Sequence, residues 1–259
     1  MKKIFPAAIL ATAFLLLAGG AFGEISQKGN LRVKVEGELS PRRLPRAGVA
    51  PVSVSVSGAI TTTDKTPPPQ LQVLTIDINR HGRFDSQGMP VCRIGQIQPA
   101  SDEVALSECR SSLVGSGSFK GTIALPGPTI YPLEGRLLLF NGRQHGHPVL
   151  LGHVFSDKPF FTSFVIVFTI AKKPHGTYGT VLKANVGEAL GSKKSLTALE
   201  MTLGRRFSYK GQRRSYISAG CPAPSGFNST PFPLARLGFS FADGRKLTSV
   251  LNRTCGARG

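Results

Sequence analysis

The sequence has no Trp, and its 14 acidic residues stand against 32 Lys and Arg, which gives a formal net charge of +18. The absence of Trp disfavours a platform for neutral sugars, because such a platform normally needs large flat aromatic faces. Catalysis by paired carboxylates would have to use scattered acids that have no flanking aromatic residues to raise a pKa. Both shortages point away from a carbohydrate-processing enzyme.

Several catalytic and metal-binding motifs are also missing. The sequence has no CxxC or HxxxH spacing for zinc, no G-x-S-x-G motif of a serine hydrolase and no G-x-G-x-x-G spacing of a dinucleotide loop. We therefore predict no catalytic residue and no cofactor. The alternative is an extracytoplasmic hydrolase or a metal-dependent enzyme whose site is built from distant loops.

No apolar run reaches the roughly 20 residues that span a bilayer. Residues 4–18 are apolar, follow Lys2 and Lys3, and precede a stretch of small residues that ends at Gly23. This order is typical of a secretory signal peptide, cleaved before Glu24; a membrane anchor is disfavoured by the length of the run. We expect residues 1–23 to be a signal peptide and the protein to be secreted, in the cell envelope or outside it, with no transmembrane segment in the mature chain.

Four Cys remain after the leader, and an even number in an exported protein indicates disulfides. Four Cys allow three pairings. The most local one joins Cys92 to Cys109 and Cys221 to Cys255, and short loops close most readily. We predict this pairing.

Hydrophobic alternation with a period of two dominates the chain. Apolar and polar residues alternate over 31–39, and Val52, Val54 and Val56 alternate with Ser. Further strands are predicted near residues 74–78, 119–125, 133–140, 149–155, 160–171, 178–186, 196–209, 213–219, 235–242 and 245–253. About a dozen short strands separated by turns favour an all-β sandwich or barrel. We expect an antiparallel β-sandwich, with residues 24–259 as one domain.

One helix is predicted near residues 102–114. Ser101 is a suitable N-cap, and Asp102 and Glu103 would face the positive helix end. Val104, Leu106, Cys109 and Leu113 would lie near one face.

Two Gly-containing pairs are turn candidates. Asp243-Gly244 predicts a two-residue type I′ hairpin. Asn141-Gly142 is a weaker candidate, because His145-Gly146 competes for the same turn.

Two clusters of residues contain possible metal ligands. Asp77, Asn79, His81 and Asp85 partly match a calcium loop, but His81 replaces an oxygen ligand and Arg80 and Arg83 would repel the cation. His145, His147 and His153 form the only local group of His and are a weak candidate for copper or zinc. The structural alternative, loop histidines without a ligand, is favoured.

The segment 205–214 carries five cations in ten residues: Arg205, Arg206, Lys210, Arg213 and Arg214. If residues 210–212 form a turn, the four Arg converge near one end of two paired strands and could bind phosphate, uronate or sulfate groups. Tyr209 and Tyr216 could add stacking. The structural alternative is that these residues lie on solvent-exposed edge strands, where their charges discourage pairing with the sheet of another molecule.

Charge of this size outside the cell gives salt-sensitive binding to anionic polymers without specific nucleic-acid recognition. Anionic cell-wall or extracellular polymers are therefore the expected partners. A third hypothesis is a scaffold that binds another envelope protein.

The chain resembles a group of uncharacterised secreted proteins of high-GC Gram-positive bacteria. The resemblance covers most of the mature chain and is carried by residues 78–82, 88–92, 105–109, 113–117, 215–224 and 241–255. It implies export and a common fold, and it implies no activity and no site residue.

Overall fold

The computed structural model describes residues 23–125, 129–158 and 160–258. The predicted signal peptide falls on residues that lie outside this part, except for Gly23, and stays a prediction. Within the described part the chain forms 18 strands and three short α-helices, which confirms the all-β class. Among these residues no helix is long and apolar enough to cross a membrane.

Thirteen strands form one sheet, in which every neighbouring pair is antiparallel except β18 and β3. In the order of the sheet they are β1 (Glu24–Lys28), β2 (Leu31–Ser40), β5 (Ser53–Thr62), β13 (Lys194–Leu203), β8 (Leu113–Ala124), β9 (Ile130–Gln144), β10 (His147–Ser156), β11 (Thr162–Lys172), β12 (Tyr178–Asn185), β6 (Leu71–Asn79), β17 (Ser229–Phe241), β18 (Lys246–Arg258) and β3 (Arg43–Pro45). Strands from both ends of the described chain therefore meet in a single sheet.

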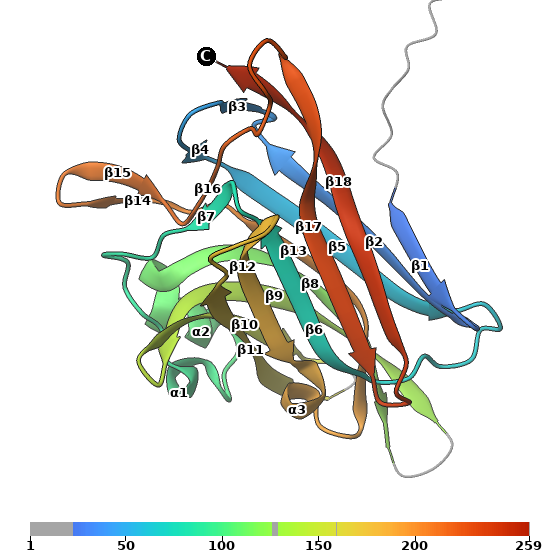
Figure 1. Ribbon diagram of the computed structural model, residues 1–259. Helices are drawn as coiled ribbons and strands as arrows, with labels where there is room; N and C mark the ends of the chain where they lie inside the picture. Colours follow the sequence, from blue (N-terminus) through green and yellow to red (C-terminus); the bar gives the residue numbers. More distant parts are fainter. Residues whose placement is uncertain (1–22, 126–128, 159, 259) are drawn as a thin grey trace, which may run out of the picture.

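The sheet curls until β1 and β2 lie against β18 (Figure 1). The Ser26 hydroxyl donates to the carbonyl oxygen of Thr248 at 2.7 Å, and Arg253 donates to the Glu24 carboxylate at 3.2 Å. Side chains thus connect β1 to β18, although these two strands do not pair with each other in the sheet. The expected β-sandwich is not confirmed, because one large curled sheet takes the place of two facing sheets.

Two smaller sheets flank the large one. Strands β4 (Ala50–Pro51), β16 (Ile217–Ala219) and β7 (Gly82–Phe84) form a three-stranded sheet. Strands β14 (Arg206–Tyr209) and β15 (Gln212–Ser215) form a hairpin that projects from the molecule (Figure 1). The predicted strands 196–209 and 213–219 are therefore each split in two.

The alternation of the sequence sets the inner face of the sheet. On β2, Leu31, Val33 and Val35 are fully buried, and the residues between them, Arg32 and Lys34, are exposed. The curled sheet encloses one large apolar core. A second, smaller core lies on its outer face, where Leu138, Phe140 and Leu151 of β9 and β10 are covered by a helical segment.

That segment contains α1 (Ile94–Ile97), α2 (Asp102–Cys109) and a 3₁₀ turn at Arg110–Ser112. The helix predicted at 102–114 starts where expected, with Ser101 accepting a hydrogen bond from the Val104 amide, but it ends early because Leu113 begins β8. Val104 is exposed and does not belong to the buried face, which consists of Ala105 and Cys109. The third helix, α3 (Val186–Leu190), was not predicted, and the strand expected at 178–186 ends at its first residue.

Both disulfides form as predicted, Cys92 with Cys109 and Cys221 with Cys255. The turn at Asp243-Gly244 is a hairpin, but the two-residue type I′ prediction is wrong. The Phe241 amide donates to the Arg245 carbonyl at 3.0 Å, which leaves a three-residue loop, and only Gly244 has positive φ. At the other candidate, His145-Gly146 forms the turn between β9 and β10, and Asn141-Gly142 lies within β9.

Candidate functional site

The basic segment 205–214 forms the projecting hairpin. Lys210 and Gly211 both have positive φ, 49° and 75°, as a two-residue turn of type I′ requires. The register pairs Phe207 with Arg214 and Ser208 with Arg213, so alternate residues face opposite sides of the hairpin. The expected turn is thus present, but it comprises Lys210 and Gly211 alone, because Gln212 already belongs to β15 and pairs with Tyr209.

The four Arg of the hairpin do not converge on one face. Arg214 turns toward the body of the protein, where its Nη1 donates to Oδ2 of Asp85 and to Oε1 of Gln87, both at 2.9 Å. The alternation places Arg206 and Arg213 on the opposite face. Arg214 is therefore an anchor of the hairpin, and the surface available to a ligand is smaller than the sequence suggests.

The remaining cations of this segment are exposed: Arg205, Arg206, Lys210 and Arg213. Within the described part of the chain none of the four has an acidic ion-pair partner. We call these four residues the basic hairpin. They can interact with an anion without first breaking an internal pair.

The two Tyr that were expected to assist binding are both used in packing. A Cβ at Gly88, where φ is +82°, would lie 2.1 Å from Cδ2 of Tyr209, so the Tyr209 ring rests directly on this Gly. Tyr216 is only 1% exposed and packs edge-to-face on Phe84, with ring centroids 5.5 Å apart. Burial raises the pKa of Tyr216 above its ordinary value. Tyr216 is thus not available to stack on a ligand.

A second basic surface lies at the same end of β6 and β11. Strand β12 pairs with both strands, so the turn after β6 and the loop after β11 come together. The Arg80 amide donates to the Thr177 carbonyl at 3.0 Å, and the Lys173 amide donates to the Gly179 carbonyl at 2.9 Å. These bonds fix the backbone around an open depression.

This depression has a volume of about 410 Å³. Its lining consists of Arg80, Gly82, Arg83, Lys172, Lys173, Pro174, Gly179 and Thr180. We call it the basic depression. Four of these eight residues are cationic and none carries a carboxylate, so the depression is complementary to an anion.

One of the four cations is already paired. Lys173 Nζ lies 3.1 Å from Oδ1 of Asp77, whose other oxygen receives a hydrogen bond of 2.8 Å from Nε of Arg236. Burial acts to raise the pKa of Asp77, but the bonds from Arg236 and Lys173 outweigh it and lower the pKa below its usual value. Arg80, Arg83 and Lys172 remain exposed, and no acidic partner is found for them among the described residues.

The charge around the depression also acts on His81, which follows Arg80 in the turn. Partial burial and then the positive charges of Arg80 and Arg83 lower the pKa of His81. The lowered pKa disfavours the charged form of the imidazole beside Arg80 and Arg83.

The basic hairpin and the basic depression are adjacent through β7 and β16. Ser218 on β16 pairs with Arg83 on β7, and the Gly220 amide donates to the His81 carbonyl at 3.0 Å. Strand β16 follows the hairpin after a single residue, Tyr216. The two surfaces therefore belong to one region of the fold.

The three His of the weak metal candidate are not brought together. His145 lies in the β9–β10 turn and His147 is exposed, whereas His153 is fully buried six residues further along β10, about 20 Å away at strand spacing. His153 Nε2 lies 3.6 Å from Oδ1 of Asp102, a neighbour that the sequence did not indicate. Among the residues that the structure describes, no three metal-ligating side chains form a group.

The partial match to a calcium loop has a structural explanation. Asp77 lies within β6 and is occupied by Arg236 and Lys173. Asp85 lies after β7 and holds Arg214. The structure therefore shows a strand end and a turn in this segment.

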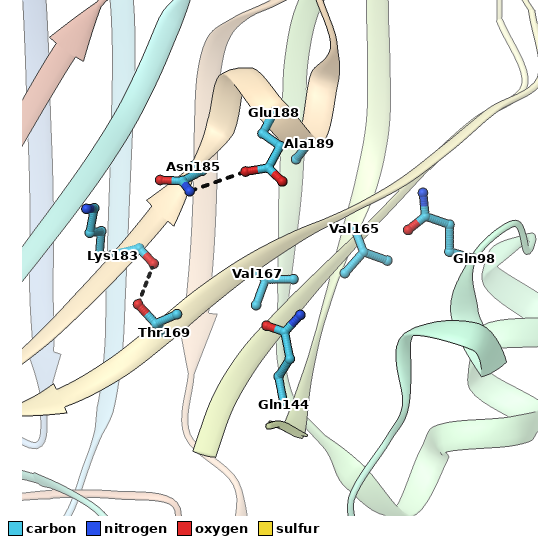
Figure 2. Close-up of a pocket in the computed structure, with 9 residues that line it drawn as sticks. All are labelled: Gln98, Gln144, Val165, Val167, Thr169, Lys183, Asn185, Glu188 and Ala189. Carbon is cyan, nitrogen blue, oxygen red and sulfur yellow. Dashed lines mark hydrogen bonds between the residues drawn. The ribbon is translucent and has the colours of Figure 1, made fainter. Parts of the chain in front are cut away.

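A further concavity of about 520 Å³ opens on the outer surface between α3 and the residue that follows α1 (Figure 2). Its sides are mostly polar, and Val165 and Val167 form part of its floor. Asn185 donates to Glu188 at 3.3 Å, and Thr169 donates to the Lys183 carbonyl at 3.1 Å. Glu188 is the single acid among the nine lining residues of Figure 2, so these residues offer hydrogen bonds but no pair of carboxylates.

Comparison of the chain with protein-family models, with curated proteins and with solved structures gave no match. The resemblance to secreted proteins of high-GC Gram-positive bacteria thus stays an expectation.

Sequence reasoning did not identify the basic depression. Arg80 and Arg83 were noted only as residues that would repel calcium, and Lys172 and Lys173 entered only through the net charge. The two pairs are about 90 residues apart, and nothing in the local sequence indicates that β12 brings them together. The doublet Lys172-Lys173 at a strand end was the one available signal.

Proposed function

We propose that the protein is an exported binding module that holds oxyanion groups of extracellular polymers at the basic depression and the basic hairpin. Phosphate, sulfate and carboxylate groups are the relevant chemistry, because guanidinium groups bind them through paired hydrogen bonds. The depression supplies a concave seat for one such group. The hairpin extends the positive surface, as a polymer with many anionic groups requires.

The observation that carries the proposal is the lining of the depression. Four cations line about 410 Å³ of open space, and three of them, Arg80, Arg83 and Lys172, have no acidic partner among the described residues. Like charges repel, so an arrangement of this kind lowers the free energy of the protein only when an anion or counter-ions occupy it. Charges that only keep a protein soluble are best interspersed with charges of the opposite sign.

Two features support the export part of the proposal. The chain has two disulfides and no free Cys among its described residues. Disulfides of this kind persist in oxidising compartments and are rare in the cytosol. A periplasmic, envelope or extracellular location is the one in which wall polymers would be encountered.

The test uses polyphosphate of defined length and two triple variants of the purified protein. One replaces Arg80, Arg83 and Lys172 by Ser, and the other replaces Arg205, Arg206 and Arg213 by Ser. At about 0.5 kcal/mol for each exposed contact, the depression variant should bind on the order of tenfold more weakly at low salt. Binding of the parent protein should fall as salt rises.

The matched control removes the same charge elsewhere. Lys28, Arg110 and Lys246 are exposed on other elements, and replacing them by Ser lowers the net charge equally. If binding depends only on total charge, this control will lose as much affinity as the depression variant, and the proposed site is wrong. If the parent protein does not bind polyphosphate at all, the proposed function is wrong.

A further inference from the structure

An apolar cavity lies inside the curled sheet, beneath β7 and β16. Its volume is about 60 Å³, and Ser218 is the one residue with a polar side chain among the sixteen that line it. Val54, Val56, Ile78 and Phe84 belong to this lining and stay partly exposed although they pack against the core. Protein interiors are close-packed, with few voids larger than a water molecule, so an apolar void of this kind is unusual.

The cavity adjoins the basic depression. Gly82 is the one residue that lines both spaces, and Ile78, whose Cγ2 lies 3.0 Å from where a Cβ of Gly82 would stand, forms part of the cavity wall beside it. Two of its neighbours on β7 face different surroundings: Arg83 lines the depression and Phe84 lines the cavity. Strand β7 therefore separates a positive surface from an apolar interior by the thickness of one strand.

We propose that this pair of spaces binds a single-chain amphiphile, with its oxyanion head in the basic depression and the end of its hydrocarbon tail in the cavity. This inference rests on the anion binding of the proposed function, and it adds an amphiphile to the polymers proposed as ligands of the same depression. Arg80, Arg83 and Lys172 match the charge of the head. The cavity takes the tail because an apolar void stays dry and accepts apolar guests.

The size of the cavity limits the part of the tail that it can hold. Each methylene group moved from water into an apolar site tightens binding about fourfold. A volume of about 60 Å³ holds only a few carbons of the tail. The gain in affinity should therefore rise steeply with chain length and then stop.

The experiment measures the affinity of the purified protein for inorganic, ethyl, butyl, hexyl and octyl phosphate by calorimetry. All concentrations stay below those at which the longer compounds form micelles. In the parent protein, affinity should rise from ethyl phosphate onward, about fourfold for each methylene until the cavity is full. The head contributes equally in every compound, so the slope reports on the tail alone.

Two variants fill the cavity and one is a matched control. Val56→Phe places a ring in the void, and Val54→Leu adds one methylene for the case that the larger change prevents folding. Val104→Phe adds the same ring at an exposed position of α2, and Val104 does not line the cavity. Both filling variants should flatten the dependence on chain length and leave the affinity for inorganic phosphate unchanged, and the control should keep the slope of the parent.

The outcomes separate the two proposals. If inorganic phosphate binds but affinity does not rise with chain length, the cavity takes no tail, and the proposed anion site survives. If long-chain compounds bind equally well after Arg80 and Arg83 are replaced by Ser, the head does not lie in the depression and the inference is overturned. If no member of the series binds, both proposals fail.

Discussion

Removal of the Cys221–Cys255 disulfide should cost about 4 kcal/mol of unfolding free energy. The bond closes a loop with a sequence separation of 34 residues, and both Cys are fully buried. In the chain-entropy description, a loop of this length restricts the unfolded chain by about 4 kcal/mol at 25 °C. The Cys92–Cys109 loop has a separation of 17, which corresponds to about 3 kcal/mol.

The assay is equilibrium unfolding in urea of the parent and of two double variants, Cys221→Ala with Cys255→Ala and Cys92→Ala with Cys109→Ala. The unfolding midpoint should fall in both. Cys221 directly follows the segment that carries the hairpin and β16, so the first variant should also loosen the basic region. If either variant unfolds within about 1 kcal/mol of the parent protein, the entropic account of that disulfide is refuted.

Two further predictions concern single residues of the basic region. Asp77→Asn should cost about 1–2 kcal/mol near neutral pH, because it weakens charged hydrogen bonds from Lys173 and Arg236 whose own side chains are half exposed. The pKa of Asp77 is lower in the folded state than in the unfolded state. The stabilisation by the ionised Asp77 is therefore complete above the ordinary carboxyl pKa near 4, and it is lost as pH falls through the folded-state pKa. Urea unfolding at pH 7 and pH 3 should therefore show a smaller difference between parent and variant at the lower pH. Gly88→Ala should cost at least about 1 kcal/mol, since a side chain at positive φ is strained and its Cβ would collide with the Tyr209 ring, and hydrogen exchange of the hairpin amides should speed up.

Each of these variants has an internal check. Gly95 in α1 has no atom within 4 Å of a Cβ and no positive φ, so Gly95→Ala should leave stability unchanged or raise it. If Gly88→Ala is tolerated as well as Gly95→Ala, the contact with Tyr209 does not fix the hairpin. If Asp77→Asn loses the same free energy at pH 3 as at pH 7, the ion pairs with Lys173 and Arg236 do not stabilise the fold.

Local pattern in the sequence was enough to find most strands and to assign their faces. The alternation of Leu31, Val33 and Val35 with Arg32 and Lys34 has the period of a half-buried strand, and the structure shows the same alternation of burial. The disulfide pairing was predicted correctly because each Cys pairs with its nearest neighbour in sequence. These features depend only on nearby residues.

The arrangement of the strands could not be predicted in this way. Strand β13 inserts between β5 and β8, and β6 pairs with β12 and β17, all of them distant in sequence. A period of two shows which side of a strand is buried, but not which strand lies beside it. The curled sheet was therefore missed and a sandwich expected.

The same limit applies to the site. The hairpin at 205–214 could be predicted from its turn and charges, but the inward position of Arg214 depends on Asp85, more than 100 residues away. The basic depression needs the pairing of β12 with both β6 and β11 before Arg80, Arg83 and Lys172 meet. The short helices α1 and α3 are about one turn long, too short for a helical period to show in the sequence.

The most direct test of the central claim is to map where a simple oxyanion binds. Inorganic phosphate is titrated into the isotope-labelled full protein, and backbone amide shifts are followed by nuclear magnetic resonance. We predict saturable shifts centred on residues 80–83 and 172–180, which disappear when Arg80 and Arg83 are replaced by Ser. Shifts that do not saturate, that are spread over the whole surface, or that persist in this variant would contradict the assignment of the basic depression as the anion site.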